Sequence, residues 1–342
     1  MPTLASFPDL LRLVAVPVLG WAAYRDVQTR RVPNRAWLPL GVLGLLLLVV
    51  DLVGVLPPTT VTDRLVLLRT AISLGLVAPL AYLFWRLGGF GGADAKALIV
   101  LAVLFPTFPT YVLPDVALPV VVPTLGVFSM TILTNTVVFG LAYPLAVALR
   151  NVLRRDFAPV MLLAHRAPVT ALPEAHGRLM ETVDGYTRSG LDLDALRMYL
   201  RWRGTTLAAL RADPGGHRDP ASVDETYDPT DGAVDPDRDS RAPSAEDSPA
   251  ESDTPAVTDI ETRLPVDSDD PWAAERFLDD IEGTAYGTDP ETLREGLAVV
   301  VDRESVWVSP GIPFVVPMFL GLVVALTYGD LLFGVLGWLG LL

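Results

Sequence analysis

Long apolar runs alternate with short polar segments over much of the chain. Six such runs lie at about residues 1–24, 36–53, 65–87, 95–105, 122–149 and 311–328. Five of them approach the ~20 apolar residues that cross a bilayer as a helix. The run at 95–105 is shorter, so it is either completed by Pro106–Tyr111 or packed as a partly re-entrant segment. The pattern predicts an all-α polytopic membrane protein with six transmembrane helices.

Basic residues predict how these helices are oriented. They gather between runs one and two, between runs three and four, and after run five: Arg25, Arg30, Arg31, Arg35; Arg86, Lys96; Arg150, Arg154, Arg155. The loops at 51–63 and 106–121 lie on the other side and are almost free of basic residues. Because cytoplasmic loops are enriched in arginine and lysine, we expect a multi-pass protein of the cell membrane with an extracellular N-terminus.

The polar region before the last run predicts three parts of the chain. Residues 1–155 would form the membrane core with five helices, 156–308 a cytoplasmic region, and 309–342 the last transmembrane helix. Two amphipathic stretches in the middle part, Leu191–Leu210 and Trp272–Val301, have apolar residues near helical spacing. Between them, 213–270 is rich in Asp, Pro, Ser and Thr and is expected to be a disordered, solvating linker.

Composition separates these two kinds of sequence. The 342 residues are 51% hydrophobic with a net charge of −14, yet 213–291 contains 24 acidic and 5 basic residues. That segment has a net charge of −19, which leaves +5 for the rest of the chain. Lys96 is the only lysine among 26 basic residues, which is typical of proteins of salt-loving organisms, although a GC-rich genome would also favour arginine. With no cysteine, disulfides and thiolate zinc sites are excluded.

A glycine-rich segment, Gly88-Gly89-Phe90-Gly91-Gly92-Ala93-Asp94-Ala95-Lys96, joins two of the apolar runs. Glycine lets the backbone turn tightly and lets another chain approach closely. Asp94 then stands at the start of an apolar helix, where an ionisable residue is a candidate functional group in need of a partner. We expect Gly91 and Gly92 to accommodate an extended substrate peptide beside Asp94.

Asp26 is the candidate partner, because it ends the first apolar run on the same predicted side of the membrane. Two neighbouring carboxyl groups share a proton, since both cannot ionise cheaply. One can then activate water while the other polarises a peptide carbonyl. Asp26 and Asp94 are therefore predicted to be the catalytic pair of an aspartic endopeptidase, with no metal and no cofactor.

These motifs resemble those of the archaeal prepilin and preflagellin (prearchaellin) peptidases, relatives of the bacterial type IV prepilin peptidases. The matching residues are Asp26 followed by Arg30, Val32, Pro33 and Asn34; Gly91-Gly92-Ala93-Asp94-Ala95-Lys96, a variant of the GxGD motif; and Trp307 to Phe314, which leads into the last helix. The resemblance covers 1–155 and roughly 270–330, whereas the acidic linker has no counterpart.

The resemblance implies removal of short basic leader peptides from pilin and archaellin precursors at the cytoplasmic face, with Asp26 and Asp94 as the catalytic residues. The bacterial relatives also methylate the new N-terminus and have a cysteine-rich zinc region, which this chain lacks. We therefore expect peptidase activity without N-methylation. The expected partners are the precursor signal peptides and the lipid bilayer, and no nucleic acid.

Simpler interpretations exist for each candidate residue. Asp26 could pair with Arg25, Arg30 or Arg31 at a helix end, and Asp94 could be a helix N-cap. Lys96 could anchor the helix at the membrane face rather than tune Asp94 or hold substrate. Arg30, Arg31 and Asn34 could shape the first loop rather than contact substrate. Asp330 is expected to be an interfacial end residue, and Ser129, Thr131, Thr134 and Asn135 to form hydrogen bonds between helices.

Two other classes of protein fit some of the pattern. A transporter could bind a proton or cation at Asp26 and Asp94, but such sites usually lie at the bilayer midplane between internal repeats, and no repeat is evident. A scaffold would need neither aspartate. The sequence leaves open whether the two carboxyl groups lie together before substrate binds, because a helix movement could bring them together.

Overall fold

The chain folds into two compact units. The computed structural model describes residues 4–29, 32–87, 89–234, 270–281, 285–311 and 313–341. The first unit, here called the membrane unit, comprises Met1–Tyr143 and Ile312–Leu342, and the second, the inserted unit, is Pro144–Gly311. These boundaries differ from the predicted 155 and 308, because helix α7 (Phe128–Arg154) continues from one unit into the other.

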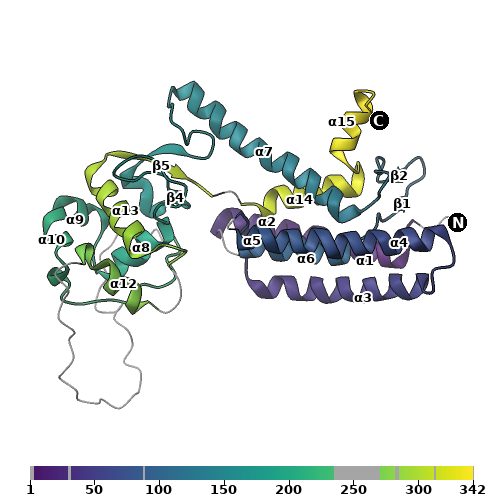
Figure 1. The fold of residues 1–342 in the computed structure, drawn as a ribbon, viewed down its shortest axis with the longest axis horizontal. Helices are drawn as coiled ribbons and strands as arrows, with labels where there is room; N and C mark the ends of the chain where they lie inside the picture. Colours follow the sequence, from purple (N-terminus) through teal and green to yellow (C-terminus); the bar gives the residue numbers. More distant parts are fainter. Residues whose placement is uncertain are drawn as a thin grey trace, which may run out of the picture. The chain divides into compact units, whose positions relative to one another are not determined.

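The membrane unit consists mainly of helices that lie side by side along a common direction (Figure 1). Its elements other than α7 are α1 (Phe7–Arg12), α2 (Ala15–Thr29), η1 (Asn34–Ala36), α3 (Trp37–Val55), α4 (Val61–Ile72), the π-helical turn η2 (Ser73–Val77), α5 (Ala78–Arg86), α6 (Gly92–Leu104), β1 (Tyr111–Val112), β2 (Ala117–Leu118), α14 (Val315–Thr327) and α15 (Leu331–Trp338). The two short strands form an antiparallel hairpin.

Four helical segments of the described chain are long and apolar enough to cross a membrane: Phe7–Thr29, Asn34–Val55, Val61–Arg86 and Phe128–Arg154. The other two predicted spans correspond to α6 and α14, each of 13 residues. At 1.5 Å per residue these helices are about 20 Å long, shorter than the ~30 Å hydrocarbon core. Four of the six predicted spans are thus recovered by length and composition.

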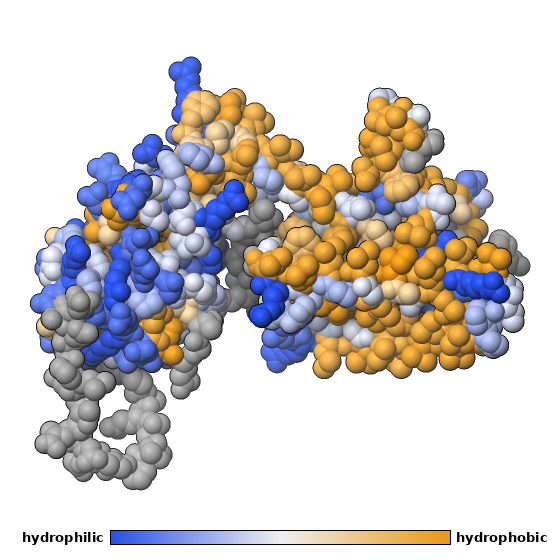
Figure 2. Space-filling view, viewed as in Figure 1, coloured by the Kyte–Doolittle hydropathy of each residue, from blue (hydrophilic) through white to orange (hydrophobic). Residues whose placement is uncertain are grey.

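The face of the membrane unit that Figure 2 shows is largely apolar. Leu38, Leu46 and Val53 of α3, for example, are 69%, 60% and 70% exposed. An apolar surface of this extent is unfavourable in water and indicates contact with lipid. We conclude that the chain is a multi-pass membrane protein.

Small residues let α3 and α6 pack closely. Gly41 lies against Val100, and a Cβ atom on Gly44 would lie 3.3 Å from the Cα of Leu104. Since both pairs advance in the same direction along the two helices, α3 and α6 run parallel. Close contact at small residues is a common source of helix association in membranes.

The inserted unit combines helices with a small sheet. Its elements after α7 are β3 (His165–Pro168), η3 (Val169–Glu174), β4 (Arg178–Leu179), α8 (Leu193–Trp202), α9 (Leu207–Ala212), α10 (Pro214–Arg218), η4 (Pro220–Ser222), η6 (Pro271–Ala273), α12 (Ala274–Asp280), α13 (Pro290–Asp302) and β5 (Ser305–Ser309). β5 is the central strand, antiparallel to β3 and β4. The all-α prediction is therefore wrong for this unit, although the chain as a whole is mostly helical.

The predicted amphipathic helices form the core of the inserted unit. Tyr199 and Trp202 of α8 contact Phe277 of α12, with ring centroids 5.5 Å from Phe277 in both cases. Helix α13 lies in the second of these stretches and begins after Asp289, whose side chain accepts a hydrogen bond of 2.8 Å from the backbone N–H of Thr292.

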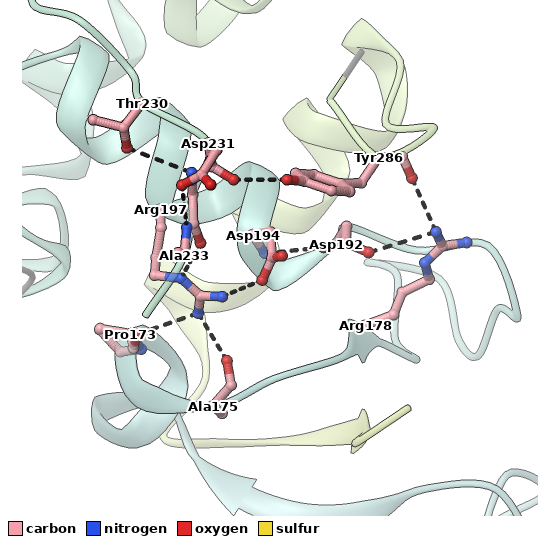
Figure 3. Close-up of polar contacts among 11 residues, drawn as sticks. Pro173, Ala175, Arg178, Asp192, Asp194, Arg197, Thr230, Asp231, Ala233 and Tyr286 are labelled. Atoms are coloured by element: carbon pink, nitrogen blue, oxygen red, sulfur yellow. Dashed lines mark hydrogen bonds and ion pairs between the residues drawn. The ribbon is translucent and has the colours of Figure 1, made fainter. Parts of the chain in front are cut away.

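Part of the acidic segment that was expected to be an unstructured linker is ordered. The buried Arg197 of α8 donates hydrogen bonds to the carbonyl oxygens of Gly232, Pro173 and Ala175 and forms an ion pair with Asp194 (Figure 3). The compact fold therefore extends to residue 234, and it resumes at Asp270, whose carboxylate lies 2.7 Å from Arg294. The rest of the predicted linker, 235–269, lies outside the described residues.

Candidate active site

Asp26 lies in the last turns of α2, three residues before the helix ends at Thr29. Its side chain is buried, although it belongs to a polar stretch of sequence. Arg30 and Arg31, the basic residues that follow it, lie outside the described residues.

Asp94 lies in the first turn of α6 and is partly buried. Its Oδ2 accepts a hydrogen bond of 2.9 Å from the backbone N–H of Gly91. Gly91, and not Asp94, is thus the N-cap residue, and Asp94 lies three positions into the helix. From there its carboxylate stabilises the start of α6, because the first N–H groups of a helix have no partner within it.

Both aspartates lie at the same end of the helix bundle. At the other end, the buried Arg12 of α1 donates a hydrogen bond of 2.9 Å to the carbonyl oxygen of Leu104, the last residue of α6. At 1.5 Å per residue, Asp26 lies about 21 Å from Arg12 along the first span, and Asp94 lies about 15 Å from Leu104 along α6. Both distances lead away from this contact toward the opposite end of the bundle. The Asp26 carboxylate acts electrostatically on Asp94. The two carboxyl groups that the sequence pairs therefore lie at the same end of the helix bundle.

The glycine-rich segment is held by aromatic contacts. The ring of Phe90 lies between those of Phe84 and Phe314, with centroids 5.1 and 4.8 Å away. The backbone N–H groups of Gly89 and Phe90 donate to the carbonyl oxygen of Phe84 at 2.8 and 3.2 Å. These contacts fix the backbone just before Asp94, while Gly91 remains exposed.

Lys96 and Asn34 lie together. The Lys96 Nζ donates a hydrogen bond of 2.6 Å to the Asn34 Oδ1, and both residues are exposed. This bond joins the start of α6 to the turn before α3. The contact fits the interpretation of both residues as part of the loop structure, beside the candidate pair. Gly92 is also exposed and has room beside it, with Trp85 Nε1 3.7 Å from the position of a Cβ.

The polar residues of α7 form the predicted hydrogen bonds between helices. Asn135 Nδ2 donates to the carbonyl oxygen of Gly329 at 2.8 Å, and Ser129 bonds to Ser73 at 2.7 Å. Thr131 and Thr134 donate to Asp330 at 2.9 and 3.2 Å. Asp330, which the sequence predicts to be an interfacial end residue, caps the start of α15 and is buried among these hydrogen bonds.

Sequence reasoning missed Arg12 and Phe314. Arg12 is a charged residue inside an apolar run, and such a residue usually pairs with another group in the bundle. In the structure it forms ion pairs with Asp9 and Asp51 in addition to its bond to Leu104. Nothing in the sequence marked the contact of Phe314 with Phe90.

The fold and this pair of carboxyl groups define a helical membrane protein with a candidate acid–base site at one end of its bundle. Residues 13–145 match the model of the type IV leader peptidase family, and residues 276–331 match that of the archaeal peptidase A24 C-terminus, type II. Together the two matches span more than half of the chain. The chain therefore belongs to the type IV leader peptidase family and is a peptidase similar to the archaeal prepilin and preflagellin peptidases. A search of curated proteins found no match.

Proposed function

We propose that Asp26 and Asp94 are the catalytic pair of this peptidase, which removes the short basic leader from type IV pilin-like and archaellin precursors. The position of both carboxyl groups at one end of the bundle, in the last turns of α2 and the first turn of α6, carries the proposal. Asp94 lies next to the exposed glycines Gly91 and Gly92, where a substrate backbone can approach. Asp26 is buried, so bulk water solvates its carboxylate less.

The reaction follows from two carboxyl groups that share one proton. The ionised carboxylate takes a proton from water, whose oxygen attacks the peptide carbonyl carbon. The protonated carboxyl group gives its proton to the carbonyl oxygen. The resulting tetrahedral intermediate breaks its C–N bond, and the leaving amine receives a proton from the pair. No metal or cofactor takes part.

The distribution of arginines supports a cytoplasmic position for this end of the bundle. There the enzyme would meet precursors before their apolar segments are assembled. We expect cleavage without methylation, since the chain has no cysteine and only a short segment separates α2 from α3. Methyl transfer from S-adenosylmethionine to the product would contradict this part of the proposal.

The test is co-expression with an archaellin or pilin precursor, with leader removal followed by electrophoretic mobility. Asp26→Asn and Asp94→Asn should insert normally and abolish cleavage. Asp63→Asn is the matched control, because Asp63 occupies in α4 the position that Asp94 occupies in α6: its carboxylate accepts a hydrogen bond of 2.8 Å from the backbone N–H of the N-cap residue, Thr60. If either active-site variant inserts and still cleaves the precursor, that carboxyl group is not catalytic and the two-aspartate mechanism fails.

A further inference from the structure

The segment that follows α7 is a turn fastened to the helix. Asn151 of α7 is buried, and its Nδ2 donates to the carbonyl oxygens of Met161 and Ala164, both at 2.7 Å. The backbone N–H of Asp156 donates to the Asn151 carbonyl oxygen at 2.9 Å. The turn is thus held at its beginning and at its end by one residue.

This turn divides its apolar side chains between an inner and an outer side. Val160 and Ala164 are buried with Met180 and Trp307 in a small core. On the outer side, three bulky apolar side chains are exposed, Phe157, Leu162 and Leu163, by 67%, 54% and 41%. The hydrogen bonds of Asn151 hold the turn in this shape, with these side chains exposed.

Basic residues flank the exposed apolar side chains. Arg150, Arg154, Arg155 and Arg166 are all exposed. Burial, and after it the positive charges of Arg150 and Arg154, lower the pKa of His165 at the end of the turn. Arg155 and Arg166 also line, with Phe157, a pocket of about 510 Å³. Arg303 lies in the same pocket but is paired with Glu181, 3.1 Å away.

The same surface continues a helix that is long enough to cross a bilayer. With 27 residues α7 is about 40 Å long, which exceeds the ~30 Å hydrocarbon core. Leu145, Leu149 and Leu153 are spaced by one turn and are 66%, 60% and 75% exposed. Figure 2 shows apolar surface along this part of α7 to its end, with hydrophilic side chains beside it.

We propose that Phe157, Leu162 and Leu163, here called the interfacial turn, enter the headgroup region of the bilayer and that the flanking arginines bind anionic phospholipids. Bulky apolar side chains beside arginines are typical of segments that lie in a membrane interface. Arginine binds phosphate groups in a bidentate manner, and basic residues next to a membrane span attract anionic lipid. The continuity with α7 favours lipid over a protein partner. This proposal does not depend on the catalytic role of the two aspartates.

The absence of cysteine allows single labels to test the interfacial turn in the full-length protein. Leu162→Cys, Leu145→Cys in α7 and Ala208→Cys in α9 would each carry a bimane label. The protein would be reconstituted in vesicles that contain brominated lipids. Ala208 is exposed, and Figure 1 shows α9 away from the end of α7. We expect the lipid to quench the labels at 162 and 145 strongly and the label at 208 weakly.

Lipid charge is tested with vesicles of phosphatidylcholine alone and with added phosphatidylglycerol. Quenching at 162 should increase with the anionic lipid. The double variant that combines Arg150→Gln and Arg154→Gln should remove that increase. Arg218→Gln, an exposed arginine of α10, should leave it unchanged. Equal quenching at 162 and 208 would overturn the proposal, and equal quenching in both vesicles would overturn the assignment to anionic lipid. A label at 162 that is shielded only when precursor is added would assign the surface to the substrate instead.

Discussion

Adding one methyl group to Gly91 should displace the Asp94 carboxylate, which we propose to be catalytic, without straining the backbone. Gly91 has φ −66° and ψ 158°, which any residue can adopt. A Cβ atom there would lie 2.9 Å from the Oδ2 of Asp94, whereas ordinary contacts begin at 3.4 Å. The carboxylate must therefore move by about 0.5 Å (3.4 minus 2.9 Å), which weakens its bond to the Gly91 N–H.

The expected loss follows from how sharply catalysis depends on position. A displacement of 1 Å costs about 100-fold in rate, so about half of that costs about tenfold, or ~1.4 kcal/mol in activation free energy. In Gly92→Ala the nearest atom to the new Cβ is Trp85 Nε1, at 3.7 Å. That is an ordinary contact, so this variant should cleave within about twofold of the wild-type rate.

The assay uses purified enzyme in detergent and a precursor substrate, with kcat and KM measured separately and thermal unfolding as the check on folding. Gly91→Ala should lower kcat and leave KM unchanged, because substrate binding is not altered. A wild-type kcat for folded Gly91→Ala would refute the argument on carboxylate position. If both variants instead raise KM to a similar degree, the glycines act mainly by accommodating the peptide backbone, as the sequence suggested.

Three further predictions concern stability. Gly44→Leu should lower the free energy of unfolding in detergent by ~1–3 kcal/mol through overpacking against Leu104, whereas Gly41→Ala should change it by less than about 0.5 kcal/mol. The lowered pKa of His165 means that the unfolded chain binds more protons below about pH 6.5. Wild-type stability should therefore fall as the pH drops through that value, and less so in His165→Gln, in urea titrations. Arg197→Leu leaves Asp194 and three carbonyl oxygens without their donor and should cost ~3–5 kcal/mol of unfolding free energy; unchanged thermal unfolding would contradict this.

The membrane helices could be predicted because their signal is local. A run of apolar residues determines a span on its own, and Asp26 and Asp94 lie at one end of the bundle because alternate helix connections lie on the same side. The register of α3 against α6 could not be predicted, because it depends on Gly44 meeting the backbone of Leu104.

The inserted unit was harder to predict because its order depends on distant contacts. β5 has only five residues, and its partner strands lie more than 120 positions earlier in the chain. The composition of 213–234 is that of a solvating segment. It is ordered because Val223 is buried in the core and because Arg197, 35 positions before Gly232, holds its backbone.

The active-site end requires both regions that match the family models, although the inserted unit separates them in sequence. Helix α14 packs against α2 and α6, which carry Asp26 and Asp94. A Cβ on Gly20 of α2 would lie 3.2 Å from the ring of Phe319 of α14. Just before α14, Phe314 contacts Phe90 in the glycine-rich segment. Without α14, helices α2 and α6 would lose a helix against which both of them pack. The inserted unit is therefore an insertion within the membrane unit, and α14 completes the packing around the two helices that carry the proposed catalytic pair.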